Sequence, residues 1–250
     1  LDTLAGGFAA GLKPTGNKDP FALRRNALGL ARTVIESGFE LDLKALLDSA
    51  VRAADADIAR TGAVLTQGGA PGSGFETQAA GELYDFILDR LRGYYADKGM
   101  PATHFNAVAA LQPASLYDFD RRLDAIGQFA ALPEAEALAA ANKRIGNILR
   151  KVEGEVSDAI VPEALVEPAE KRLAEALLGV ETVAHTELAQ RNYVTALKHL
   201  AQLREPIDAF FEDVMVMAED PRVRANRLAL LQRIARRFLS VADVSLLASG

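Results

Sequence analysis

The sequence predicts an all-α protein, and three features agree on this. Hydrophobic residues repeat every three or four positions along most of the chain, which is the spacing of one face of a helix. Half of the 250 residues are hydrophobic, yet only 6% are aromatic and Trp is absent, so Ala and Leu supply most of the apolar surface. Both residues have high helix propensity, and their abundance favours helices packed on small side chains.

Composition also excludes several classes of protein. Cys is absent, which excludes a disulfide framework, a thiolate metal site and a cysteine nucleophile, and indicates a cytoplasmic protein. No apolar run approaches the roughly 20 residues that cross a bilayer, and no leader opens the chain, so we expect neither membrane insertion nor export. Because Leu1 rather than Met begins an amphipathic segment, we interpret the chain as part of a longer protein.

The net charge is -6 and the pI is near 5.2, so a protein that coats DNA or other nucleic acid non-specifically is not expected. A single basic face on an acidic body remains compatible with selective docking of a polyanion, because the body repels backbone that lands elsewhere.

Capping residues, Gly and Pro divide the first half of the chain into short helices. Asp19-Pro20 is a capping residue followed by a proline, which is tolerated in a first helical turn. Ser115 is the expected cap of a later helix. The Gly-rich stretch at 67–74 is typical of a linker, and only residues 63–66 hint at a strand. The predicted helices of this half cover residues 20–37, 42–60, 77–98, 102–111 and 115–132.

The second half is also predicted to be helical, with one less regular stretch that contains Pro162 and Pro168. The predicted helices of this half cover residues 134–152, 168–178, 182–204, 206–217 and 222–247.

Neither metal chemistry nor phosphate-loop chemistry finds support in the motifs. His104, His185 and His199 are far apart, and the last two would lie about 21 Å from each other even on one long helix, so they do not share a metal. Residues 11–18 loosely imitate a phosphate loop, but the lysine is displaced by one position and no Ser or Thr follows it. We therefore expect no catalytic residue and no metal site.

The predicted helix at 134–152 has a basic face opposite an apolar one. Residues placed at 100° intervals put five polar side chains within about 120° of arc, while Leu138, Ile145 and Val152 lie on the other side. Lys and Arg bind phosphates, and Asn can read a base edge. No acid interrupts this face, so it is a candidate RNA-binding surface, although an ordinary solvated face fits equally well. The five candidates are Lys143, Arg144, Asn147, Arg150 and Lys151.

Positions 222 to 237 hold six arginines and no acidic residue, unlike the mixed charges of most helix surfaces. Arg224 and Arg227 fall beside the apolar stripe, where we expect them to pair with acids such as Asp213 or Glu219. The four arginines expected on the far side, available to RNA, are Arg222, Arg233, Arg236 and Arg237. Tyr193 is the best nearby candidate for base stacking, although burial is the more common fate of such a ring.

Several long strings resemble the β subunit of the bacterial α2β2 glycyl-tRNA synthetases. They are LDTL at 1–4, LKPTGNKDPFALRR at 12–25, KRIGNILRK at 143–151, FFEDVMVMAED at 210–220 and RANRLALL at 224–231. The resemblance covers essentially the whole chain. It implies a helical body and linker followed by a bundle similar to the DALR-type anticodon-binding domain of the arginine enzyme.

The resemblance also implies domain limits and partners. Residues 1–60 would be the last helices of an HD-like body, 61–134 a helical linker region, and 135–250 the DALR-like bundle. The His-Asp pair that names the HD fold is absent from this chain. In the family the α subunit uses ATP and Mg²⁺ to activate and transfer glycine, while the β subunit binds tRNA(Gly). This chain would then hold no cofactor of its own, and its partners would be tRNA(Gly) and the α subunit of the tetramer.

Two functions remain to be separated: an anticodon-arm binding module, and an assembly module without RNA contact. Exposure of Arg233, Arg236 and Arg237 together with Lys143 and Arg150 on a concave surface would favour RNA. The same arginines each bound to a carboxylate would favour assembly. An independent hydrolase would need a cluster of His and carboxylates, which the spacing does not offer.

Overall fold

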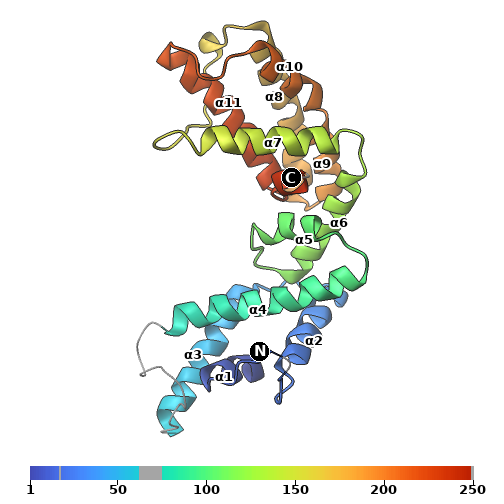
Figure 1. The fold of residues 1–250 in the computed structure, drawn as a ribbon, viewed down its shortest axis with the longest axis vertical. Helices are drawn as coiled ribbons and strands as arrows, with labels where there is room; N and C mark the ends of the chain where they lie inside the picture. Colours follow the sequence, from blue (N-terminus) through green and yellow to red (C-terminus); the bar gives the residue numbers. More distant parts are fainter. Residues whose placement is uncertain (17, 62–74, 249–250) are drawn as a thin grey trace. The chain divides into compact units, whose positions relative to one another are not determined.

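The computed structural model describes residues 1–16, 18–61 and 75–248, and these residues form helices joined by short turns (Figure 1). Thr15 and Lys18 form an isolated β-bridge, and none of the described residues belongs to a β-strand. The all-α prediction is therefore confirmed. The expected linker at 67–74 and the hint of a strand at 63–66 lie outside the described residues.

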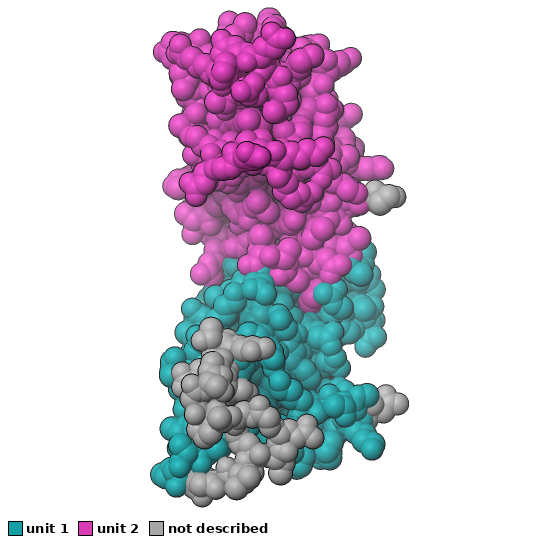
Figure 2. Space-filling model, turned by 60° about the vertical axis from the view of Figure 1, so that its left-hand side comes forward, with its two compact units in different colours: residues 1–102, 112–120 teal, residues 103–111, 121–250 magenta. Residues whose placement is uncertain are grey.

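The chain divides into two compact units (Figure 2). The first comprises residues 1–102 and 112–120, and the second comprises residues 103–111 and 121–250. The three-part division expected at residues 60 and 134 stays a prediction.

In the described part of the first unit, helices α1 to α4 pack around a core of aliphatic and aromatic side chains, including Leu47, Tyr84 and Ile87. Figure 1 shows α3 and α4 running beside each other, with α1 against α3 and α2 against α4. The helices are α1 (Asp2–Ala9), α2 (Leu23–Glu36), α3 (Leu43–Thr61) and α4 (Phe75–Asp97).

The start of α2 differs from the prediction, which placed Pro20 in the first helical turn. The helix begins at Leu23, after Ala22 in a left-handed conformation with φ 55°. Both carboxylate oxygens of Asp19 accept hydrogen bonds, from the backbone N–H of Leu23 at 2.8 Å and of Arg24 at 3.0 Å. Asp19 therefore caps the helix as expected, but from farther away, because the chain turns at Ala22 before it becomes helical.

The second unit contains the remaining helices, except that Ala102 of α5 and the first residues of α6 belong to the first unit. In Figure 1, α7 crosses α11, and the two are in contact. The elements are α5 (Ala102–Ala109), α6 (Leu116–Ala130), α7 (Ala135–Leu149), η1 (Pro162–Ala164), α8 (Pro168–Ala189), α9 (Tyr193–Ala201), α10 (Arg204–Asp213), α11 (Pro221–Leu239) and η2 (Val244–Leu247).

Helix boundaries between 168 and 217 differ from the prediction. Helix α8 continues through Gly179, where a break was expected, because Leu177 before the glycine and Val180 after it are both buried on the same helix. The break comes instead at Arg191, whose φ of 57° turns the chain before α9. His185 and His199 consequently lie on different helices rather than on one long one.

Two helices end before their predicted limits. Helix α10 ends at Asp213, and Val214 is extended. Helix α11 begins at Pro221, where the Asp220 carboxylate accepts from two backbone N–H groups, and it ends at Leu239 rather than near 247. The residues after it turn into the short η2, which packs against α7 and closes the core.

Candidate functional site

The basic face predicted on α7 is exposed. Helix α7 buries Leu138, Ala141 and Ile145, and its opposite side faces solvent, as the 3.6-residue period requires. Lys143 and Lys151 have no ion-pair partner among the described residues. The five exposed side chains of this α7 face are Lys143, Arg144, Asn147, Arg150 and Lys151.

Two of these side chains have neighbours that orient them without neutralising them. The guanidinium of Arg144 lies 4.0 Å from the ring centroid of Phe211 on α10, in a cation–π contact. The guanidinium of Arg150 donates to the Asn147 side-chain oxygen. The α7 face therefore keeps its full positive charge in solvent, which suits contact with a polyanion.

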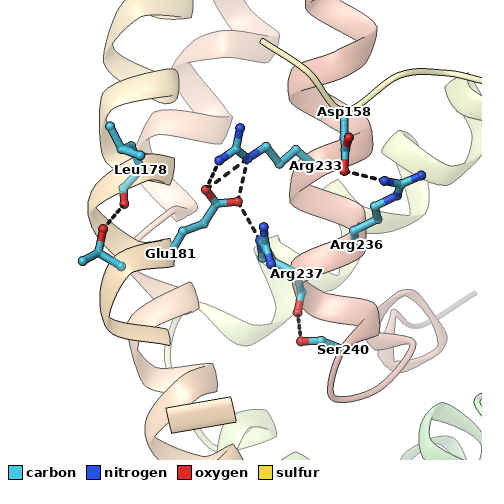
Figure 3. Close-up of polar contacts among 8 residues, drawn as sticks. Asp158, Leu178, Glu181, Arg233, Arg236, Arg237 and Ser240 are labelled. Carbon is cyan, nitrogen blue, oxygen red and sulfur yellow. Dashed lines mark hydrogen bonds and ion pairs between the residues drawn. The ribbon is translucent and has the colours of Figure 1, made fainter. Parts of the chain in front are cut away.

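On α11, two arginines share one carboxylate (Figure 3). Arg233 donates from Nε to both oxygens of Glu181 on α8, at 2.8 and 3.0 Å, and from Nη2 to one of them at 2.5 Å. Arg237, one turn further along α11, donates from Nε to Glu181 at 2.6 Å. The Glu181 side chain is 8% exposed, whereas those of Arg233 and Arg237 are 29% and 35% exposed.

The charges around Glu181 control its protonation. Burial by itself would raise the pKa of Glu181, but the hydrogen bonds and positive charges of Arg233 and Arg237 outweigh burial and leave this pKa below its usual value. The hydrogen bond from Arg233 to Glu181 likewise raises the pKa of Arg233. The carboxylate is therefore ionised at neutral pH, and the three groups together carry one net positive charge.

The two other predicted α11 arginines are exposed and differ from each other. Arg236 points to the other side of the helix and pairs with Asp158, in the segment that follows α7 (Figure 3). Arg222, in the first turn of α11, has no ion-pair partner among the described residues.

Two expectations about buried groups on α11 need correction. Arg227 does not pair with Asp213 or Glu219: it is buried, binds the fully buried Glu170 on α8, and donates to the Met215 carbonyl at 2.7 Å. Glu170 also belongs to the capping box at the start of α8, so the acid that Arg227 meets comes from a distant helix rather than the preceding one. Arg224 donates instead to backbone carbonyls of the preceding turn, at 2.9 and 3.5 Å.

Tyr193 is buried, at 5% exposure, and offers no open face for stacking. Arg122 on α6 lies 4.5 Å from its ring centroid and donates to its hydroxyl at 3.0 Å. The same guanidinium donates to the carbonyls of Ser240 and Val241, just after α11, at 2.8 Å each. Arg122 thus joins α6 to α9 and to the residues just after α11. Burial, the more common fate expected for the Tyr193 ring, is confirmed, and base stacking on it is not supported.

Neither a metal-binding cluster nor a membrane-spanning helix occurs in the described part of the chain. His, Asp and Glu side chains there form no group of three arranged to hold a metal ion. None of the helices described has the length and apolar character needed to cross a bilayer.

Comparison with known proteins identifies the family. A family model described as "Glycyl-tRNA synthetase beta subunit" matches residues 1–110, and one described as "DALR anticodon binding domain" matches residues 138–243. A glycine–tRNA ligase beta subunit from Xanthomonas campestris pv. campestris is 62% identical over the whole chain. The chain belongs to the glycyl-tRNA synthetase β-subunit family. It spans about a third of the length of this relative, 34%, and the resemblance to the β-subunit family is confirmed.

Further relatives of the same description agree. One from Xylella fastidiosa is 56% identical over 98% of this chain and 36% of its own length, and one from Pseudomonas aeruginosa is 47% identical over 99% of this chain and 34% of its own length.

The nine predicted site residues all lie within the stretch that matches the DALR domain. The structure groups five on the α7 face and places two on Glu181, while Arg236 and Arg222 stand apart from these groups. No described contact joins the α7 face to the α11 arginines, so their convergence into one patch stays a prediction. Sequence reasoning missed Glu181 and Asp158. Their arginine partners lie more than fifty residues later in the chain, so no local sequence pattern marks these two acids as members of ion pairs.

Proposed function

We propose that this chain forms the tRNA-binding part of the β subunit of a cytoplasmic glycine–tRNA ligase. The chain grips the anticodon arm of tRNA(Gly) and so positions the acceptor end at the partner α subunit, which uses ATP and Mg²⁺ to attach glycine. Its own residues contribute orientation rather than bond-making, and they need no cofactor.

The observation that carries this proposal is the α7 face. Within the stretch that matches an anticodon-binding domain, its cations are exposed and no acid neutralises them. In an acidic chain such a face attracts phosphate backbone locally, while the remaining surface repels it. Asn147 in its middle offers an amide for a base edge or a sugar hydroxyl.

The test is tRNA(Gly) binding by the full-length ligase at two salt concentrations. Each phosphate that a variant no longer neutralises lowers the slope of log affinity against log salt by about 0.7 to 0.9. Lys143→Glu with Lys151→Glu should therefore weaken binding and reduce that slope by roughly 1.5, since two cations that face phosphate are removed.

The matched control reverses two exposed cations outside the DALR stretch, with Lys18→Glu and Arg25→Glu. The total charge change is the same, so general electrostatics would lower affinity equally in both variants. Equal losses would contradict the assignment of the α7 face, as would unchanged affinity of the Lys143/Lys151 variant.

An assembly role is the alternative, and two observations favour it. Arg233, Arg236 and Arg237 are each bound to a carboxylate, which is the arrangement expected of an assembly surface. Met215 and Met217, in the segment after α10, are 76% and 56% exposed, and exposed apolar side chains this close together suit contact with another protein. Native mass spectrometry of the ligase with Met215→Ser and Met217→Ser shows whether the α–β complex still forms. Loss of this complex, together with an unchanged affinity for tRNA(Gly) in the binding titration, supports assembly.

A further inference from the structure

The arginine pair on α11 would be unfavourable without Glu181. Arg233 and Arg237 are four residues apart, so like charges face each other across one helical turn. Glu181 binds both, and its two oxygens accept every hydrogen bond that joins the three side chains. Because the carboxylate is almost fully buried, it holds both guanidinium groups in fixed orientations (Figure 3).

The hydrogen bonds to Glu181 leave one edge of each guanidinium open. Arg233 uses Nε and Nη2, so its Nη1 has no hydrogen-bond partner among the described residues. Arg237 uses Nε alone, so both its Nη1 and Nη2 are without one. None of these three nitrogens is a buried, unsatisfied donor, so each has access to solvent. Arg237 therefore keeps its whole Nη1/Nη2 edge, the fork that binds two oxygens of one phosphate, and Arg233 keeps its Nη1 beside it.

We propose that Glu181 is a positioning residue that holds Arg233 and Arg237 as a preorganised pair for a phosphodiester group of RNA. The inference rests on the proposed function and deepens it. Arg side chains lose much rotamer freedom when they bind, and a bridge that already restricts them lowers this cost. The bridge also leaves the site one net positive charge.

This role makes a prediction opposite in sign to simple electrostatics. Glu181→Gln removes a negative charge beside two arginines, so charge alone would strengthen RNA binding. Positioning predicts weaker binding, by about tenfold if one charge-assisted hydrogen bond to phosphate is broken, with a salt slope smaller by about 0.7 to 0.9. Glu175→Gln is the matched control, because Glu175 is an exposed acid on the same helix without an ion-pair partner among the described residues.

The assay measures affinity of the full-length ligase for tRNA(Gly) in a double-mutant cycle. The effect of Glu181→Gln should disappear when Arg233→Gln and Arg237→Gln are already present, because Glu181 acts only through them. Weakening of equal size in both backgrounds would mean a general structural role and would overturn the proposal. The proposal would also be overturned if Glu181→Gln bound tRNA(Gly) as tightly as wild type or more tightly, which is the result expected for Glu175→Gln.

Arg237→Lys keeps the proposal testable if Glu181→Gln disturbs folding. This change preserves the charge and removes the planar fork, so weaker binding with unchanged far-UV circular dichroism supports positioning. Wild-type affinity of Arg237→Lys overturns it. Failure of the proposed function would be seen separately, as wild-type binding by the Lys143/Lys151 variant.

Discussion

Replacing Arg227 by Met removes one charge from a buried ion pair and keeps most of the aliphatic volume. Arg227 is 6% exposed and its partner Glu170 is 0% exposed. Among the described residues, the other donors to the Glu170 carboxylate are the backbone N–H groups of Val166, at 2.6 Å, and Glu167, at 3.1 Å. Arg227→Met therefore leaves a buried carboxylate without a counter-charge, and it also removes the donor to the Met215 carbonyl.

The expected loss is about 3 to 5 kcal/mol in the free energy that holds α8 against α11, because the remaining charge stays buried and unpaired. Amide hydrogen exchange of peptides from α8 and α11 measures this locally, which matters in a chain of two units that need not unfold together. The loss corresponds to exchange faster by about two to four orders of magnitude.

Arg172→Met is the matched control. Arg172 lies 3.8 Å from Asp213, and both side chains are more than half exposed, so this pair should contribute about 0 to 1 kcal/mol. Adding Glu170→Gln to Arg227→Met should recover part of the loss, since the stranded charge is then removed. The reasoning is refuted if Arg227→Met costs no more than Arg172→Met, or if the double variant is less stable than Arg227→Met alone.

Three further predictions follow from single sites. Because the pKa of Glu181 is lowered in the folded state, its ionic contribution to stability is present above the unfolded pKa of about 4.3 and is lost as pH falls below that value. The difference in unfolding free energy between wild type and Glu181→Gln, measured by urea unfolding, should therefore become smaller below about pH 4. It should not become smaller at high pH. Arg122→Met should lower the free energy of local opening around the end of α11 by about 2 kcal/mol, measured by amide hydrogen exchange, because it removes the hydrogen bonds to Ser240 and Val241. Tyr193→Phe should lower it by only about 1 kcal/mol, since it leaves those two hydrogen bonds in place and removes the one to the hydroxyl. Gly179→Ala should stabilise α8 by up to about 1 kcal/mol in thermal melts, because the added Cβ meets no atom within 4 Å.

The sequence by itself determined the helical class, most helices and the exposed face of α7. These follow from local rules: the period of apolar residues places Leu138 and Ile145 inward and Lys143 outward, and Asp42 and Ser115 bond to nearby backbone N–H groups as expected of capping residues. The sequence strings were also enough to indicate the family.

Only the tertiary structure decided the fate of the arginines on α11. Their partners, Glu170 and Glu181, lie more than fifty residues earlier in the chain, on α8. Helical periodicity predicts which way a side chain points, but an ion pair between helices depends on how the helices cross and in which register. For the same reason Gly179 remained helical: burial of its neighbours outweighed a modest local preference.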